Sequence, residues 1–106
     1  MTKDIIKEEA LRVFNESADA VKNLTNRINT DFVDAVKVIT DSKKVVVSGV
    51  GKSGIIAKKI VATFNSIGIK SVFLHPVEAL HGDLGIVEEG DCAILLSKSG
   101  TTDEIV

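Results

Sequence analysis

Apolar residues recur at spacings of three and four in the first part of the chain and gather into short unbroken runs further on. Between residues 4 and 28 this spacing predicts one apolar stripe on a long helix with polar residues elsewhere. The stripe consists of Leu11, Phe14, Ala18, Val21, Leu24 and Ile28. A second helix is predicted after a cap at Thr30 or Asp31, and it should end near Ser42. We therefore assign residues 1–43 to two N-terminal helices.

Three short apolar runs in the rest of the chain predict strands at residues 44–48, 71–74 and 92–96, of which the first and third should be buried. A helical pattern from about residue 55 to residue 67 separates the first two, and Gly68 is suited to the position just past its end. Pro76 stops the second strand because it has no N–H to donate. The order strand, helix, strand, loop, strand is typical of a parallel α/β sheet, which we assign to residues 44–106.

Two further features complete this outline. The loop over residues 77–87 is rich in glycine and should hold one helical turn around residues 78–80. Residues 103–106 predict the first turn of a last helix, which the chain does not complete. We therefore expect the chain to be the front part of a larger fold.

Glycines stand at positions 49, 51 and 54, directly after the valines of the first predicted strand. Glycine allows a tight turn and lets backbone N–H groups approach a ligand closely, and Ser53 adds a hydroxyl. The first amides of the following helix lack partners and its dipole favours negative charge, so strand, turn and helix together predict an anion site. We expect this loop to hold a phosphate.

The residues of the glycine loop alone leave three other interpretations open. The glycine spacing matches the dinucleotide fingerprint G-x-G-x-x-G, but that fingerprint expects an acidic residue at the end of the second strand, where His75 and Pro76 stand. Lys52 and Ser53 suggest a Walker A loop, which would need a glycine at the position of Val46. The third interpretation is a tight turn without a ligand.

A second polar loop follows the third predicted strand. Residues 97–102, SKSGTT, place several hydroxyls and a glycine between a buried strand and a helix start. By themselves these hydroxyls could serve as helix caps. In a doubly wound sheet of order 2-1-3, however, strands one and three are neighbours at the switch point where ligands bind, so the two loops converge. Two convergent hydroxyl-rich loops fit a phosphate monoester better than a dinucleotide.

Composition narrows the possible partners. The 106 residues suffice for one domain, and 44% of them are hydrophobic and 26% charged. A net charge of −2 argues against nucleic acid, and no apolar run approaches the ~20 residues that span a membrane. The single cysteine, Cys92, favours a reducing, cytoplasmic location. A zinc set of His75, His81, Asp83 and Cys92 fits no structural-zinc spacing, so we expect no metal and no cofactor.

The segments GVGKSG, HPVEALHGDLG and SGTTDE occur here in that order. Together they resemble the sugar isomerase (SIS) domain, and within it the arabinose-5-phosphate isomerase branch, from about residue 5 to the last residue. The resemblance implies a flavodoxin-like sheet of order 2-1-3 and a sugar phosphate as the ligand. It makes Ser53, Ser97, Ser99 and Thr102 the candidate phosphate ligands. The full candidate binding set is Gly51, Ser53, Gly54, Ser97, Ser99, Gly100, Thr101 and Thr102.

The resemblance also implies that Lys52, His81 and Glu104 belong to the active site. Aldose–ketose isomerisation moves a proton between C1 and C2 through an enediolate, so it needs a base, a shuttle for the hydroxyl proton and a cation beside the oxyanion. Glu104 is the candidate base, His81 the candidate shuttle or ring-opening residue and Lys52 the candidate cation. The residues alone leave structural roles open. Glu104 could be a carboxylate in the first turn of a helix, where the helix dipole stabilises it, and His81 could hold its loop in place.

Two functions follow from the resemblance. The first is interconversion of ribulose 5-phosphate and arabinose 5-phosphate, on the route to lipopolysaccharide; the alternative is a non-catalytic SIS module that senses a phosphosugar. Family members continue past the position of Val106 and draw further site residues from there, so we expect this chain by itself to be inactive. An edge strand at residues 92–96 and the apolar helix stripe predict self-association into a homo-oligomer.

Overall fold

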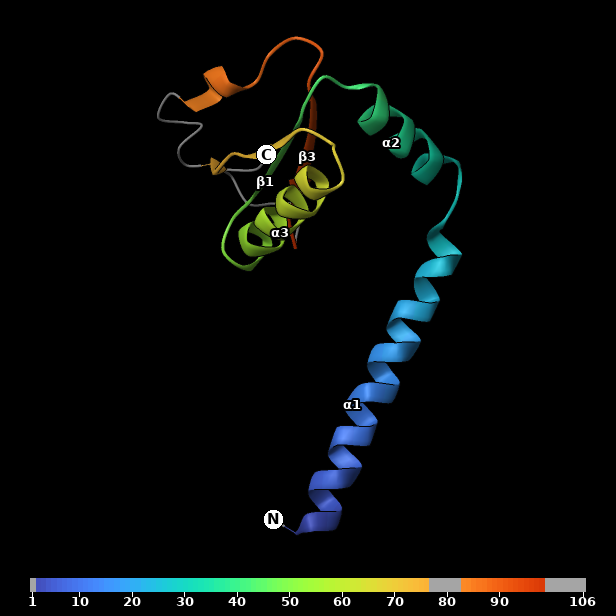
Figure 1. Ribbon diagram of the computed structural model, residues 1–106. Coiled ribbons are helices and arrows are strands. Elements are labelled where there is room, and N and C mark those ends of the chain that lie inside the picture. Colours follow the sequence, from blue (N-terminus) through green and yellow to red (C-terminus); the bar gives the residue numbers. More distant parts are fainter. Residues whose placement is uncertain (1, 77–82, 99–106) are drawn as a thin grey trace. The chain divides into compact units, whose positions relative to one another are not determined.

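The computed structural model (Figure 1) describes residues 2–76 and 83–98 of the chain. The chain divides into two compact units, residues 1–36 and 37–106. The first unit is helical and the second holds the sheet, and the boundary falls inside the second helix.

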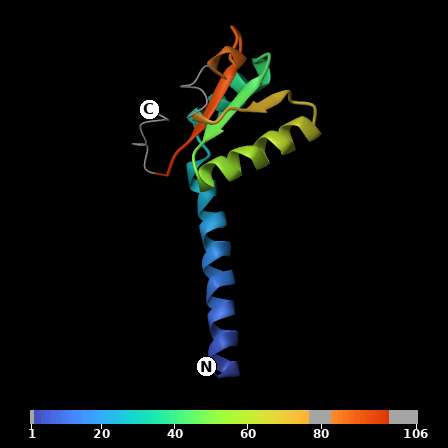
Figure 2. The ribbon, with the colours of Figure 1, turned by 90° about the vertical axis from the view of Figure 1, so that its left-hand side faces the viewer.

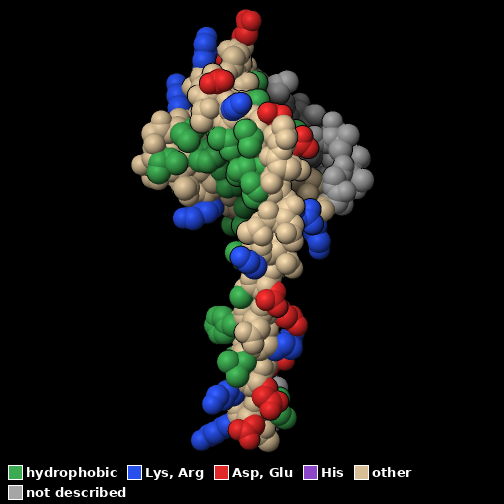
Figure 3. All heavy atoms as spheres, turned by 90° about the vertical axis from the view of Figure 1, so that its right-hand side faces the viewer, with side chains coloured by type: hydrophobic (Ala, Val, Ile, Leu, Met, Phe, Trp, Pro, Cys, Tyr) green, Lys and Arg blue, Asp and Glu red, His purple; other side chains and the backbone are tan. Residues whose placement is uncertain are grey.

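The first helix, α1 (Lys3–Asn23), begins after Thr2, whose Oγ1 accepts a hydrogen bond from the backbone N–H of Ile5 at 3.2 Å. A 3₁₀ turn, η1 (Leu24–Arg27), completes the stretch that was predicted as one helix. Of the residues in α1, all of which the structure describes, none is buried. Figure 3 shows hydrophobic side chains along this helix open to solvent between charged ones. The predicted stripe is thus present, and it is exposed.

The second helix, α2 (Thr30–Asp41), ends close to the predicted position. Its first turn is capped by Asn29, whose side-chain oxygen accepts a hydrogen bond from the backbone N–H of Phe32 at 3.2 Å. The predicted cap at Thr30 or Asp31 was therefore wrong by one or two positions. Asparagine caps a helix as well as aspartate or serine does, and its place just before the helix explains the earlier start.

Within the described residues, the sheet consists of three parallel strands, β1 (Val45–Gly49), β2 (Ser71–Phe73) and β3 (Cys92–Leu96). Their order in the sheet is β2-β1-β3, which confirms the predicted order 2-1-3 and the α/β class. Figure 2 shows the strands side by side. The central strand is the one that the run of valines predicted.

Both faces of β1 are covered. Val45 and Val47 are 0% exposed and Val46 is 2% exposed, as expected for the central strand of a parallel sheet. The prediction of a buried third strand holds for one face only, because Leu95 on the other face is 57% exposed. The partly buried residues around the core are Ile39, Ile60, Val61, Phe64, Ile69, Phe73, Ile94 and Leu96.

The third helix, α3 (Lys52–Ser66), packs on one face of the sheet (Figure 1). It places Ala57, which is fully buried, against Val45 and Val47. The helix begins three residues earlier than predicted. The turn from β1 needs only Val50 and Gly51, so the helix already includes Gly54.

The end of α3 fixes the start of β2. Gly68 has φ +88°, and its N–H donates to the carbonyl of Asn65 at 3.3 Å while the N–H of Ile69 donates to the carbonyl of Phe64 at 2.9 Å. This pair of bonds forms a Schellman motif, with Gly68 at the position just past the helix end that the sequence predicted. The side chain of Asn65 then accepts from the N–H of Ser71 at 2.8 Å and donates to its carbonyl at 3.0 Å.

The connection from β2 to β3 contains a 3₁₀ turn, η2 (Asp83–Ile86). The helical turn predicted around residues 78–80 lies outside the described residues. Among the helices of the described part, none is long and apolar enough to cross a membrane.

Candidate functional site

The ends of β1 and β3 lie side by side at the carboxyl edge of the sheet. Gly49, the last residue of β1, is in register with Leu96, the last residue of β3. From this row β1 continues into the glycine turn, and β3 continues into Ser97 and Lys98. The two polar loops therefore leave the sheet from neighbouring strand ends, where ligands bind in open α/β sheets.

The glycine turn is shaped by a close approach of helix to strand. A β-carbon on Gly54 would lie 2.7 Å from the carbonyl oxygen of Gly49, and one on Gly49 would lie 2.8 Å from the carbonyl group of Ser53. Gly51 has φ +61°, where residues with a β-carbon are strained. Chain reversal and helix packing thus account for the G-x-G-x-x-G spacing without a dinucleotide.

The start of α3 presents backbone amides at the same edge. The first N–H bonded inside this turn is that of Ile55, which donates to the carbonyl of Gly51 at 3.2 Å. The amides of residues 51–54 therefore have no partner within the helix, and the helix dipole makes this end positive. Lys52 is exposed beside them and Ser53 is half-buried. This arrangement can bind an anion.

The end of β2 brings His75 to the same edge. The sequence placed this residue at the end of the second predicted strand and gave it no role beyond an unfavoured zinc set. Leu74, just before it, is held on both sides, since its N–H donates to the carbonyl of Val47 at 3.0 Å and its carbonyl accepts from the buried hydroxyl of Ser48. The His75 ring lies edge-on to Phe73, with 6.3 Å between ring centroids. The strand order was the signal that could have placed His75 at this edge.

The structure brings part of the predicted site together. Gly51, Lys52, Ser53, Gly54 and Ser97 all lie at the carboxyl edge of the sheet, and Ser97 is half-buried. Within residues 2–76 and 83–98, no three His, Cys, Asp or Glu side chains are grouped as a metal site would require. The other predicted site residues lie outside the described ranges, and their roles stay predictions: His81, Ser99, Gly100, Thr101, Thr102 and Glu104.

These features define a parallel α/β domain with an anion-binding arrangement at its strand ends. Residues 38–106 match the SIS domain family, and the chain belongs to that family. This agrees with the resemblance drawn from the sequence motifs.

Known proteins similar to the chain include arabinose 5-phosphate isomerases. It is 48% identical over 98 residues to KdsD of Pseudomonas aeruginosa and 51% identical over 83 residues to GutQ of Escherichia coli K12. These matches cover 92% and 77% of this chain but 30% and 26% of the relatives, so the chain spans less than a third of their length. A protein of Escherichia coli CFT073, solved in complex with arabinose 5-phosphate, has a TM-score of 0.90 and 42% identity, covering 99% of this chain and 56% of that one.

Proposed function

We propose that the chain forms the phosphosugar-binding part of an arabinose 5-phosphate isomerase. The observation that carries this proposal is the register of Gly49 with Leu96, which starts two polar loops at one edge beside the amides of α3. A phosphate monoester would take the amides of residues 51–54 on one side and the loop that begins at Ser97 on the other. The relatives named as arabinose 5-phosphate isomerases, and the neighbour solved with arabinose 5-phosphate, support this choice of ligand.

In this proposal the phosphate is held by serine and threonine hydroxyls and by the backbone of the glycine turn. The residues concerned are Ser53, Ser97, Ser99, Thr101 and Thr102, with the backbone of Gly51, Gly54 and Gly100. Hydrogen bonds to a charged oxygen are about twice as strong as neutral ones, so a dianionic group rewards this many donors. His75 stands at the same edge and would flank the sugar.

The chemistry assigned to the site is a proton transfer between neighbouring carbons. Glu104 takes the proton from C2 of the aldose and returns it to C1, while His81 moves the hydroxyl proton from O2 to O1. Lys52 steadies the negative charge of the enediolate between these steps. With the family resemblance we also propose a cytoplasmic location, a homo-oligomer and a role in supplying lipopolysaccharide synthesis.

Hydrogen exchange tests the ligand site. We expect arabinose 5-phosphate, and more weakly inorganic phosphate, to protect the amides of residues 51–54 and 97–102 together, because both loops face one anion. Arabinose without the phosphate serves as the control and should protect neither loop. Protection of one loop alone, or a preference for NAD over the sugar phosphate, would reject the proposal. Binding without turnover in a full-length protein would support the phosphosugar-sensing alternative.

A further inference from the structure

A nearly buried ion pair joins the start of β1 to the start of β3, at the end of the sheet opposite the proposed phosphate site. The ammonium of Lys44 lies 3.2 Å from the carboxylate of Asp91, and their side chains are 12% and 3% exposed. The same ammonium donates to the carbonyl of Ile86 at 2.6 Å. The carboxylate also accepts a hydrogen bond from the backbone N–H of Glu88 at 2.8 Å. Two segments of the chain, Lys44 at the start of β1 and residues 86–91 before β3, therefore meet at one charge pair.

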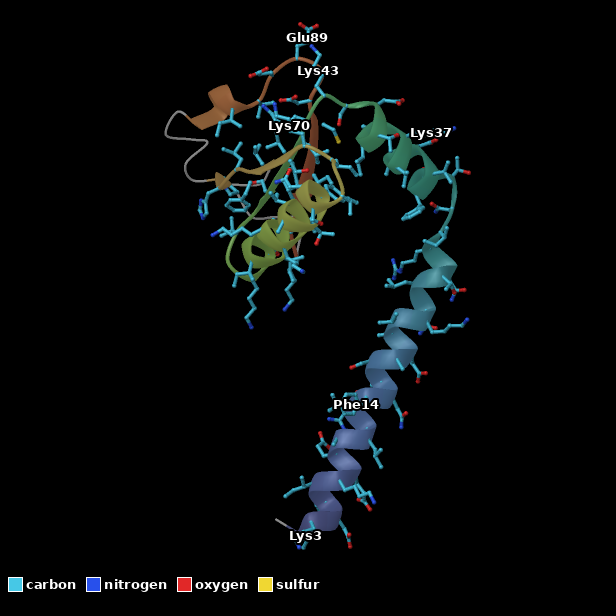
Figure 4. The ribbon with its side chains drawn as sticks, in the orientation of Figure 1. Lys3, Phe14, Lys37, Lys43, Lys70 and Glu89 are labelled. Atoms are coloured by element: carbon cyan, nitrogen blue, oxygen red, sulfur yellow. The ribbon has the colours of Figure 1, made fainter. Side chains whose placement is uncertain are left out.

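Two backbone hydrogen bonds beside this ion pair join the residues before β1 to those at the start of β3. The N–H of Lys43 donates to the carbonyl of Gly90 at 3.0 Å, and the N–H of Cys92 donates to the carbonyl of Lys44 at 2.9 Å. Gly90 has φ +88°, and a β-carbon there would lie 3.2 Å from Cδ of Lys43, so the lysine stem passes over the glycine. Figure 4 shows Lys43 and Glu89 together at this end of the sheet.

The surroundings of Asp91 keep its carboxylate ionised at neutral pH, so that it can pair with Lys44. The hydrogen bond from Glu88, and after it the neighbouring Lys44, hold the pKa of Asp91 below its usual value. Lys43 adds a weaker attraction of the same sign. The carboxylate is therefore ionised and available to Lys44 throughout the physiological range.

The hydrophobic pattern of β3 does not by itself fix the register of this strand against β1. Alternate residues face the core and the solvent, with Ile94 inside and Leu95 outside. Because all five residues of β3, CAILL, are apolar, the sequence of the strand alone does not fix its register, and a slip of two residues would even keep the same residues on each face. Such a slip would move Ser97 along β1 by roughly 6.6 Å, at about 3.3 Å per residue, and break any shared contact with the glycine turn. In the described sheet β3 pairs only with β1, so no second neighbour fixes its register.

We propose that the Lys44–Asp91 pair is a register lock that positions Ser97 beside the glycine turn. Lys44 and Asp91 are then positioning residues for a site at the far end of the strands. The ligand in this argument rests on the proposed function, whereas the register does not. Buried ion pairs contribute little net stability compared with apolar residues of the same volume, and fixing register is their best-attested role. The lock should therefore show in register and ligand affinity more than in stability.

The test replaces both charges at once and leaves the core otherwise intact. In the double variant Lys44→Met with Asp91→Leu, we expect a folded chain whose thermal midpoint stays close to that of the parent. Cross-strand NOEs between Val47 and Ile94 should weaken and a second set, shifted by two residues, should appear. Affinity for arabinose 5-phosphate should fall roughly tenfold or more, the effect of losing a hydrogen bond to a charged group. Lys44→Arg keeps the charge and is the matched control, with register and affinity retained.

The other outcomes for the double variant contradict the proposed register lock. A double variant with the parent register and unchanged affinity overturns it directly. One that fails to fold, or melts far below the parent, also overturns it, because the pair would then serve stability. If the parent chain itself does not bind arabinose 5-phosphate, the proposed function fails, and the NOE register alone decides whether the lock exists.

Discussion

The backbone of Gly54, in the first turn of α3, lies so close to Gly49, the last residue of β1, that a β-carbon on Gly54 would sit 2.7 Å from the Gly49 carbonyl oxygen. The two nearest atoms belong to the backbone of Gly49, and they cannot give way without moving the strand or the helix. This contact sets the angle at which α3 leaves the sheet. It therefore also sets the direction of the amides of residues 51–54, which we assign to the phosphate.

Gly54→Ala should destabilise the chain by about 1–3 kcal/mol, the usual cost of overpacking a close contact. Urea denaturation followed by circular dichroism measures the change. Gly85→Ala is the matched control, since a β-carbon there meets nothing within 4 Å, and we expect a change within about 0.5 kcal/mol. Equal effects of the two substitutions would show that the contact with Gly49 is not what requires glycine at position 54.

Most of the fold could be predicted from local signals in the sequence. The three valines of β1 predicted a strand covered on both faces, and Gly68 predicted the end of α3, because each feature is written in adjacent residues. The strand order followed from the topology rules for parallel sheets. The cap of α2 was misplaced because Asn29, Thr30 and Asp31 are all good cap residues and only the backbone decides among them.

Features that depend on contacts between residues far apart in the sequence could not be predicted. The exposed face of β3, with Leu95, depends on which elements cover the sheet, and a run such as CAILL does not encode this. The pair of Lys44 with Asp91 joins residues far apart in the chain, and both would ordinarily be read as surface charges. Of the candidate site, the edge on which Ser97 lies was predictable from strand order. The catalytic roles came from the family resemblance alone.

Acid should destabilise the second unit through Asp91. Its pKa is lowered in the folded chain, first by the hydrogen bond from Glu88 and then by Lys44, and in the unfolded chain it returns to its ordinary value of 3.8. A group whose pKa is depressed on folding stabilises the fold fully above its unfolded pKa, and this contribution is lost as pH falls through the folded pKa. Unfolding by urea should therefore become easier below about pH 4, and Asp91→Asn should flatten this dependence.

The control for the acid experiment lies on α1. Glu9 also has a lowered pKa, owing to its hydrogen bond with Arg12, but this pair is exposed to solvent. Exposed ion pairs contribute little, so Glu9→Gln should leave the acid limb nearly unchanged. An acid limb that is the same in the parent and in Asp91→Asn would contradict the assignment. A loss of stability in Asp91→Asn is compatible with the small effect expected when both charges are removed. Removing one partner of a buried ion pair lowers the stability more than replacing both partners with apolar residues.

Lys52 should matter for binding more than other lysines on the same helix. It is exposed at the first position of α3, next to the amides assigned to the phosphate. Lys52→Ala should weaken binding of arabinose 5-phosphate roughly tenfold, as expected for a charge-assisted contact. Lys59→Ala removes another exposed lysine further along α3 and should have little effect. Isothermal titration calorimetry compares the two, and equal losses would indicate general electrostatic attraction in place of a specific contact.

The catalytic assignment needs a full-length enzyme. Residues 38–106 can replace the matching segment of the Pseudomonas aeruginosa isomerase, which is 48% identical to this chain over 98 residues. In that chimaera we expect His81→Ala and Glu104→Gln each to lower kcat by about 10²–10⁴, the usual range for positioned acid–base groups. Ser99→Ala should act mainly on KM, because it is assigned to the phosphate. Normal turnover of Glu104→Gln would mean that the base is another residue.

Self-association should run through the apolar stripe of α1. Phe14 is 73% exposed on this helix (Figure 4), and burying such a side chain is worth about 1.5–3 kcal/mol. A second copy of the chain offers the same stripe, so we expect oligomers in sedimentation velocity runs at increasing concentration. Phe14→Glu should raise the dissociation constant at least tenfold, while Asn15→Glu, which adds the same charge beside the stripe, should change it little. A chain that stays monomeric would contradict the prediction, and equal effects of the two variants would move the interface elsewhere, with the exposed Leu95 face of β3 as the next surface to test.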